Sequence, residues 1–206
     1  MSKPYQLAVG PLAVNCFLWK TNRDEVLIVD PGAEPERIAR FLKGKNLRPV
    51  AIALTHGHPD HLGGAGELAH RYDIPVYLHS GDMMWIPILK EQWGAEFGPR
   101  PRFWPEFTPY PAELTFPELT LKVQPLPGHS AGSVVLLDEA AGVAVVGDTL
   151  FAGGIGRTDL PGGDEETLFE GLRRVLLSLP AETVVLPGHG PETTIGREKA
   201  SNPFLG

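Results

Sequence analysis

The feature that most constrains this chain is a histidine-rich turn that directly follows a short apolar run. Residues 50–54 read VAIAL, which is typical of a buried strand, and residues 55–64 read THGHPDHLGG. Three of the seven histidines thus lie close together, beside Asp60. A polar surface turn could carry such histidines without a role, but a cluster of histidine and aspartate favours a metal site. The remaining ligands must then come from other parts of the chain.

Four predicted strands are each followed by a histidine or an aspartate. In chain order these residues are His56, His129, Asp148 and His189, which follow the runs VAIAL, LTLKVQPL, VAVVG and TVVLPG. Short loops held by rigid strands are a common way to build a preorganised site. We therefore expect the four side chains to converge on one site.

The spacing within the histidine-rich turn predicts two groups of ligands. His56 and His58 are two residues apart, so on an extended segment their side chains point the same way. Pro59 favours an extended conformation at His58. Asp60 and His61 come after the proline, where the chain turns toward a helix, and should face a different direction. This arrangement suits two adjacent cations, and nitrogen and oxygen donors without a thiolate suit zinc, iron or manganese.

Other polar residues are weaker candidates. Asp30, in IVDPG, either forms the turn after a strand or supports a ligand from behind. His70 and His79 have no partner pattern, so a surface or packing role is expected. Asp148 is either a loop carboxylate or the bridge between two metals. Cys16, in the run VNCFLW, is expected to be a buried thiol in a strand.

Composition limits the class of protein and its surroundings. The 206 residues suit one globular domain spanning 1–206, and 42% of them are apolar. No run approaches the ~18 apolar residues of a membrane helix, and the first residues lack a secretion signal. With a single cysteine, we expect a cytoplasmic protein with no membrane partner. The net charge is −7 and basic residues form no run, which argues against a nucleic-acid partner.

Apolar patterning predicts an α/β fold with layered sheets and outer helices. Helices are expected over 34–45, 67–72 and 165–179, and residues 81–93 are expected to be helical on either side of Pro87. Strands are expected over 25–30, 50–54, 75–79, 119–126, 133–138, 143–148 and 183–188, with 133–138 and 143–148 forming a hairpin. Residues 98–111, rich in proline and aromatic side chains, either cover the mouth of the site or pack on a sheet.

Four motifs together resemble the metallo-β-lactamase superfamily. They are THGHPDH at 55–61, GHS at 128–130, GDT at 147–149 and GHG at 188–190. The segments GDTLFAGGIGRTDLPGGD and GHGPETTIGREKASNPFL further resemble the short, single-domain bacterial members of the glyoxalase II group. The resemblance implies a four-layer αββα sandwich with two divalent metals at one edge. Zinc is the expected metal, with iron or manganese as alternatives.

The resemblance also implies a role for each ligand. The first metal would be held by His56, His58 and His129. The second metal would be held by Asp60, His61 and His189. Asp148 would bridge both metals, and Asp60 would also orient the attacking hydroxide.

The reaction implied by the resemblance is hydrolysis of a thioester such as a 2-hydroxyacyl-glutathione. A hydroxide between two cations is nucleophilic at neutral pH. A thiol leaves without a general acid, because its pKa of about 8.5 is far below that of an alcohol or an amine. In contrast to longer members, we expect no C-terminal helical glutathione-binding domain, and Gly190 stands where they carry a tyrosine. Arg157 falls where they place a basic residue, so it is the expected substrate-binding residue.

Three alternatives remain. The segment GRTDLPGGD also resembles persulfide dioxygenases, in which a single iron would sit on His56, His129 and Asp148. A hydrolase of other esters, lactones or amides, including a β-lactamase, is the second. A nuclease or a noncatalytic metal-binding module is the third. The complete second ligand set favours the hydrolase.

Overall fold

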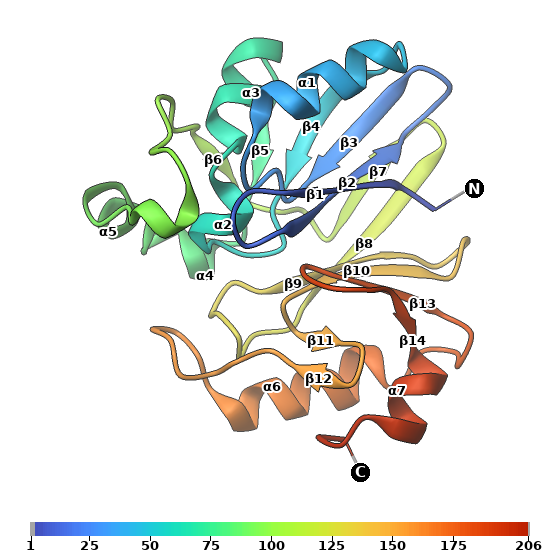
Figure 1. The fold of residues 1–206 in the computed structure, drawn as a ribbon. Coiled ribbons are helices and arrows are strands. Elements are labelled where there is room, and N and C mark those ends of the chain that lie inside the picture. Colours follow the sequence, from blue (N-terminus) through green and yellow to red (C-terminus); the bar gives the residue numbers. More distant parts are fainter. Residues whose placement is uncertain (1–2, 206) are drawn as a thin grey trace.

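The computed structural model describes residues 3–205 (Figure 1). Its first half forms one sheet of six strands in the order β1-β2-β3-β4-β5-β6. These are β1 (Tyr5–Val9), β2 (Val14–Lys20), β3 (Glu25–Val29), β4 (Arg48–Ala53), β5 (Val76–Tyr77) and β6 (Phe107–Thr108). The first three strands pair antiparallel, and β3 to β6 pair parallel.

The second half forms another six-stranded sheet, in the order β14-β13-β10-β9-β8-β7. Its strands are β7 (Glu113–Phe116), β8 (Leu119–Pro125), β9 (Val134–Asp138), β10 (Val143–Gly147), β13 (Val184–Pro187) and β14 (Thr193–Thr194). The predicted hairpin of β9 and β10 is confirmed, and the parallel pair β10–β13 lies beside it. A separate two-stranded ribbon consists of β11 (Leu150–Phe151) and β12 (Gly154–Ile155).

Helices cover the outer faces of both sheets (Figure 1). On the first half α1 (Pro35–Gly44) and α3 (Ala65–Tyr72) cover the sheet, whereas α2 (Pro59–Leu62), α4 (Ser80–Met83) and α5 (Ile86–Glu91), followed by a 3-10 turn, Ala95–Phe97, lie toward one edge (Figure 1). On the second half, α6 (Glu165–Gly171) continues into a π-helical turn, Leu172–Leu176, and α7 (Ile195–Ser201) follows β14. Among the described residues, no helix is long and apolar enough to cross a membrane.

Three apolar cores hold four layers together. Between the sheets, Trp19 and Leu27 of the first sheet pack with residues such as Leu136 of the second. Alternate residues of β2 and β3 face α1 and α3 instead. The outer face of the second sheet packs on α6 and α7. Because the central strands are apolar on both faces, they fit only between two covering layers, and the αββα sandwich is confirmed.

The prediction of helix on either side of Pro87 agrees with the structure, in which α4 and α5 are separated at residues 84–85 and not at the proline. Helix α5 begins at Ile86, so Pro87 lies within its first turn. A proline is tolerated there because the first amides of a helix have no intrahelical acceptor. The predicted helix over 165–179 is confirmed in outline, but regular α-helix ends at Gly171.

Residues 98–111 pack against the first sheet and the helices that cover it. The ring of Phe103 stacks on His70 with 3.9 Å between centroids, which also confirms a packing role for His70. Trp104 packs against the core beneath α1 and α3, and the Tyr110 hydroxyl donates to the carbonyl of Leu54. None of the residues lining the cavity near the histidine cluster comes from this stretch.

The topology brings the polar strand ends to one edge of the sandwich. Strands β8, β10 and β13 run in the same direction, because β9 is antiparallel to both β8 and β10, and β13 is parallel to β10. Strand β4 reaches the same edge from the first sheet. The Val134 amide donates to the Thr55 carbonyl at 2.8 Å, and the Asn15 amide donates to the Gly188 carbonyl at 2.7 Å. These bonds join the two sheets beside the predicted ligands.

Candidate metal centre

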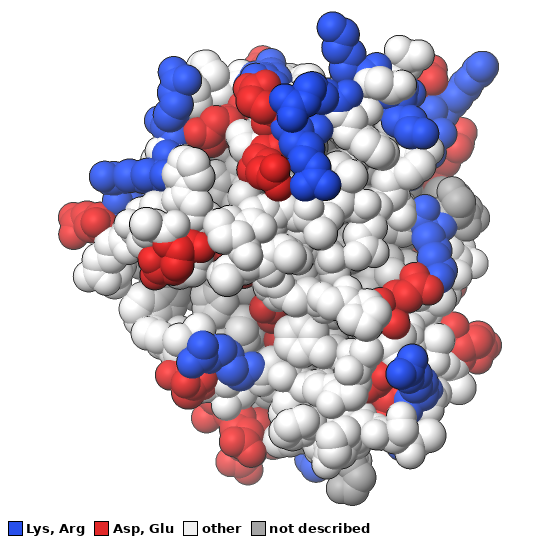
Figure 2. Space-filling view, in the orientation of Figure 1, with Lys and Arg blue, Asp and Glu red and all other residues white. Residues whose placement is uncertain are grey.

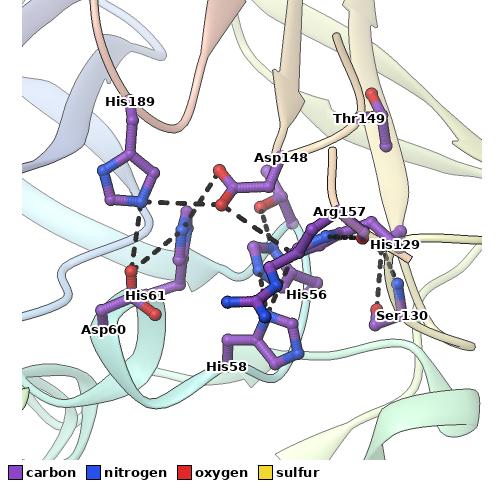
Figure 3. A network of polar contacts seen from close by, with 12 residues as sticks. His56, His58, Asp60, His61, His129, Ser130, Asp148, Thr149, Arg157 and His189 are labelled. Carbon is purple, nitrogen blue, oxygen red and sulfur yellow. Dashed lines mark hydrogen bonds and ion pairs between the residues drawn. The ribbon is translucent and has the colours of Figure 1, made fainter. Parts of the chain in front are cut away.

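All seven predicted ligands lie together at this edge (Figure 3). Their donor atoms form three groups within which every atom lies within 4.8 Å of the others. The groups are His56, His58 and His129; His56, His61 and Asp148; and Asp60, His61 and His189. The first and third groups match the two predicted ligand sets, and the second lies between them.

In the first group, three ring nitrogens point at one another. The Nδ1 atom of His58 lies 3.1 Å from Nε2 of His56 and 3.0 Å from Nε2 of His129. His56 and His58 come from the loop after β4, whereas His129 comes from the loop after β8. Two loops from opposite sheets therefore form this group.

In the third group, a carboxylate faces two imidazoles. Oδ2 of Asp60 lies 3.1 Å from Nε2 of His189 and 3.7 Å from Nε2 of His61. Asp60 and His61 lie in α2, which begins at Pro59 with His58 extended before it, as the sequence predicted. The change of direction at the proline is what separates these two side chains from His56 and His58.

Asp148 lies between the two groups (Figure 3). Its Oδ1 atom is 3.4 Å from Nε2 of His61, and its Oδ2 atom is 3.6 Å from Nε2 of His189 and 3.8 Å from Nε2 of His129. One carboxylate thus reaches imidazoles of both sets, which is the position required of a bridging ligand.

The outer nitrogens of His129, His189 and His61 each face an acceptor. Nδ1 donates to the Arg157 carbonyl at 2.8 Å in His129, to the Leu12 carbonyl at 3.0 Å in His189, and to the Asp30 carboxylate at 2.9 Å in His61. Carbonyl and carboxylate oxygens only accept, so the proton of each neutral ring resides on Nδ1. The Nε2 lone pairs therefore point into the site, as in histidines that bind metals.

His56 is oriented by a chain of two bonds. The Thr55 hydroxyl donates to Asp30 at 2.7 Å and so accepts from Nδ1 of His56, 3.0 Å away. Asp30 also accepts the Thr55 amide at 2.7 Å. Asp30 was expected either to form a turn or to support a ligand. Its carboxylate supports two predicted ligands, contacting His61 directly and His56 through Thr55.

The residues present fit a bound cation. Nε2 of His61 and Oδ1 of Asp148 are buried, and the described part of the chain offers neither atom a hydrogen-bond partner. A buried polar atom without a partner is costly. Lone pairs from several imidazoles and two carboxylates converge there, so a positive ion would satisfy all of them at once.

The electrostatics of the protein match this donor set. Burial lowers the pKa of the His56 and His58 imidazoles, that of His58 to about 4, with further lowering by neighbouring histidines. Burial raises the pKa of the Asp60 and Asp148 carboxyls, but the nearby His61 and other imidazoles outweigh it, so both pKa values are lowered. The first set is therefore neutral and the carboxylates are ionised, which is the form in which these groups bind metals. Burial lowers the pKa of the His61 and His189 imidazoles, but the nearby carboxylates outweigh it and raise both pKa values, so a bound cation would displace a proton from these two rings.

Asp82 is a supporting residue that the sequence analysis missed. Its buried carboxylate accepts hydrogen bonds of 2.7 Å from the Gly57 amide, the Ser130 hydroxyl and the Gly132 amide. It therefore joins the loop of His56 and His58 to the loop of His129. Asp82 lies in α4, five residues after the end of β5, and nothing in the local sequence indicates these distant partners.

Arg157 lies beside the centre, with an exposed side chain. Its guanidinium forms two bonds of 2.7 Å with the Asp159 carboxylate, which lowers the pKa of Asp159 to about 2. Its carbonyl is the acceptor for His129. Arg157 therefore lies near the site. Its main-chain carbonyl contacts a predicted ligand, His129, whereas its side chain pairs with Asp159. His79 accepts the Gly81 amide at the start of α4, so its expected structural role is confirmed.

A cavity of about 250 Å³ opens beside His58. Its walls come from α4, α5, the 3-10 turn and the loop at Leu160. A wider, shallow depression lies at the other end of the cluster, at His189. The cluster therefore has a partly enclosed cavity on one side and a more open depression on the other.

Comparison with known proteins agrees with the motifs and the fold. The family model of the metallo-beta-lactamase superfamily matches residues 9–189. The probable metallo-hydrolase YqgX of Bacillus subtilis (strain 168) is 40% identical, over 97% of this chain and 96% of its own length. The hydroxyacylglutathione hydrolase GloC of Haemophilus influenzae is 38% identical, over 93% of this chain and 92% of its own.

Solved structures show the same likeness. The BLEG-1 B3 metallo-beta-lactamase superposes with a TM-score of 0.89 at 38% identity, covering 98% of both chains. TTHA1623 in a di-iron-bound form superposes with a TM-score of 0.85 at 40% identity, covering 98% of this chain and 100% of that one. With the sandwich, the motifs and the family model in agreement, the chain belongs to the metallo-beta-lactamase superfamily.

Proposed function

We propose that this chain is a metal-dependent hydrolase of thioesters, with a 2-hydroxyacyl thioester of glutathione as a representative substrate. The observation that carries the proposal is the pair of complete ligand sets, His56, His58, His129 and Asp60, His61, His189, with Asp148 between them. Two divalent metals are proposed to occupy them, with zinc expected and iron or manganese as alternatives. Such ions, when bound, lower the pKa of water and polarise a carbonyl oxygen.

The side chains of the centre are suited to hydrolysis. Asp60 is an ionised carboxylate whose Oδ2 faces the interior of the cluster, so it can accept a hydrogen bond from a water molecule and orient it for attack. Asp148 lies where it can balance positive charge on both sides of the cluster. His61 is held rigidly by Asp30, so the site is ordered before substrate arrives.

The walls of the cavity favour a leaving group that needs no proton. Besides His58, which belongs to the proposed ligand set, and the neutral amide of Gln92, its polar lining residues are Ser130 and Asp82, which are bonded to each other. An amine or an alcohol must be protonated as it leaves, but a thiolate need not be. The likeness to GloC, whose name gives hydroxyacylglutathione hydrolase, supports the same choice.

Hydrolysis of a β-lactam amide is the second candidate, because the chain is similar to BLEG-1, a B3 metallo-beta-lactamase. The experiment is to load the purified protein with zinc, iron or manganese and to measure turnover of a 2-hydroxyacyl-glutathione and of a penicillin. Oxygen uptake with glutathione persulfide is recorded in parallel. We expect the thioester to be cleaved fastest. Cleavage of the penicillin alone, or oxygen uptake without hydrolysis, would overturn the proposal in favour of the corresponding alternative.

Arg157 is proposed to contact the glutathione half of the substrate. We expect Arg157→Ala to raise KM for a glutathione thioester more than it lowers kcat, by an amount equivalent to about 1–3 kcal/mol, as for a hydrogen bond to a charged group. The carbonyl that holds His129 belongs to the main chain and remains in this variant. Steady-state kinetics with glutathione and truncated thioesters provide the measurement. An unchanged KM with both substrates would remove the Arg157 side chain from the substrate site.

A further inference from the structure

We infer that two buried residues, Glu198 in α7 and Asn202 at its C-terminal end, are positioning residues of the metal centre. We call them the α7 latch. They hold the ribbon of β11 and β12, and the two ends of this ribbon lie against the predicted ligands Asp148 and His129. The inference rests on the proposed metal centre but not on the choice of substrate.

The α7 latch binds both a donor and an acceptor in the main chain of the ribbon (Figure 1). Oε2 of Glu198 accepts the Gly153 amide at 2.8 Å, and the Asn202 side-chain amide donates to the Gly154 carbonyl at 3.1 Å. The same Asn202 amide donates to Oε2 of Glu198 at 2.8 Å, and the Thr193 hydroxyl donates to Oε1 at 2.5 Å. Because these bonds share their partners, the ribbon cannot shift against α7 without breaking several of them.

The carboxylate of Glu198 contributes hydrogen bonds and not apolar packing. Glu198 is fully buried, and its described polar contacts are all with uncharged donors. In the view of Figure 2, Lys and Arg lie mainly toward the margins of the face. Burying a carboxylate among uncharged groups costs free energy that an apolar side chain would not cost. Only the hydrogen bonds of Glu198 offset this cost, and one of them is to the ribbon.

The ends of the ribbon lie against two predicted ligands. Asp148 lies two residues before β11, and the Gly156 amide closes the ribbon on the Thr149 carbonyl at 3.1 Å. A Cβ atom at Gly156 would overlap the main-chain oxygen of Asp148 and lie 3.3 Å from Cβ of His129. The next carbonyl, that of Arg157, accepts the Nδ1 proton of His129 at 2.8 Å (Figure 3). A displacement of the ribbon would therefore move both ligands.

The second ligand set is supported by other segments. Asp60 and His61 lie in α2, and Nδ1 of His61 bonds to Asp30. Nδ1 of His189 bonds to the Leu12 carbonyl. Loosening the α7 latch should therefore disturb the outer hydrogen bond of His129 and leave that of His61 in place.

The first measurement is the affinity for cobalt(II), a spectroscopic probe ion, by titration against a competing chelator. We expect Glu198→Ala to weaken binding about tenfold, the lower end of the loss found for groups that orient metal ligands. The visible absorption of bound cobalt should change with it. Wild-type affinity and absorption in Glu198→Ala would overturn the inference.

A conservative variant separates the hydrogen bonds of Glu198 from its charge. Glu198→Gln keeps an oxygen that can accept from Gly153 and Asn202, and its amide can donate to the Thr193 hydroxyl. It should therefore restore nearly the wild-type affinity and the wild-type cobalt spectrum. A loss in Glu198→Gln as large as that in Glu198→Ala would overturn the role assigned to these hydrogen bonds.

Thr194→Ala is the matched control on the same helix. The Thr194 hydroxyl caps α7 by accepting the Arg197 amide, and within the described chain it forms no bond with the ribbon. The variant should lower the Tm and leave the cobalt affinity and spectrum unchanged. An equal loss of affinity in Thr194→Ala would attribute the effect to the general stability of α7 and would overturn the inference.

A measurement on the metal-free protein separates this inference from the proposed function. Magnetic resonance spectra of the protein with isotope-labelled histidine report the proton on each ring nitrogen. In Glu198→Ala we expect the Nδ1–H of His129 to exchange faster with water, while that of His61 is retained. If the wild type binds no metal, the proposed function fails, but this comparison still tests the α7 latch. Identical His129 signals in the wild type and in Glu198→Ala would overturn the inference.

Asn202→Ala decides the test if Glu198→Ala does not fold. It removes the bond to the Gly154 carbonyl and leaves Glu198 bound to Gly153. The loss of one such hydrogen bond corresponds to about threefold or more, so we expect a decrease of that size in cobalt affinity, together with faster exchange at His129. Unchanged affinity and unchanged exchange in folded Asn202→Ala would then overturn the inference.

Discussion

The orientation of each histidine ring in the cluster depends on the hydrogen-bond partner of its outer nitrogen. A neutral imidazole carries one N–H proton. When Nδ1 donates that proton to an acceptor, the lone pair of Nε2 is left free to bind a metal. Asp30 accepts the Nδ1 proton of His61 directly, and it orients His56 through the hydroxyl of Thr55. It adopts a positive φ of 50°, a backbone conformation that aspartate tolerates better than most residues. The same strand-end position that suggested a turn residue thus also delivers a carboxylate to the ligands.

Asp148→Asn tests whether the shared carboxylate is essential for charge balance. An amide keeps the shape but cannot neutralise two cations, so we expect turnover to fall on the order of a hundredfold or more. Folding should change little by comparison, and thermal unfolding of the metal-free variant monitors this. Full activity with metals still bound would remove Asp148 from the proposed mechanism.

At the scale of elements, the centre depends on close approach between the loops that follow the strands. Gly188 follows β13, and a Cβ atom there would overlap the Asp148 carboxylate and lie 2.6 Å from Cε1 of His61. Gly190, two residues later, has a φ of +74° but has no neighbouring atom within 4 Å of an added Cβ. The two glycines of the GHG motif thus serve different purposes. Gly188 allows the close approach of Asp148 and His61, and Gly190 adopts a left-handed backbone conformation.

Gly188→Ala should therefore displace Asp148 and weaken metal binding at least tenfold, comparable to the loss of a group that orients a ligand. The matched control is Gly190→Ala, which should cost about 1–2 kcal/mol of stability from the left-handed conformation and leave metal affinity nearly unchanged. Titration with a competing chelator measures both affinities. Equal losses of metal affinity would indicate that backbone strain, rather than contact with Asp148, matters at Gly188.

At the scale of the whole molecule, two sheets of different connectivity supply ligands to one edge. The first sheet contributes the loop after β4, and the second contributes the ends of β8, β10 and β13. Cys16 of β2 lies on the face of the first sheet that packs against the helical layer and is fully buried. Burial raises the pKa of its thiol, and the charge of Asp30 raises it further.

Cys16 should consequently report on global unfolding. We expect a thiol reagent at pH 8 to label the folded protein at least about a thousandfold more slowly than the denatured protein, because a folded domain exposes such a thiol only in its rare unfolded state. Labelling followed by mass spectrometry measures both rates. Rapid labelling of the folded protein would show that the first sheet opens locally at β2.

Much of the fold followed from patterns that are local in the sequence. Strands with continuous apolar runs and the hairpin of β9 and β10 were predicted because burial on both faces leaves a clear signal. The two-residue strands β11, β12 and β14 are too short to show alternation, and they form because neighbouring segments hold them. The place of residues 98–111 depended on partners such as His70, which lie far away in the sequence.

The convergence of the seven predicted ligands was also visible in the sequence, because each follows a strand end or lies in the histidine-rich turn. The supporting groups were harder to find. Asp82 acts through Ser130 and Gly132, and nothing in the local pattern around residue 82 indicates those distant partners. Long-range hydrogen bonds of this kind are determined by the tertiary fold and not by periodicity.

The number of metal ions that the centre holds tests the account most directly. The metal-free protein is titrated with zinc and, anaerobically, with ferrous iron, and the bound metal is quantified after removal of the excess. Two complete ligand sets with a shared carboxylate predict two ions per chain at saturation, and one in a variant carrying both Asp60→Ala and His189→Ala, which retains the first set. A single tightly bound iron in the wild-type protein, with no second ion at saturation, would contradict the account.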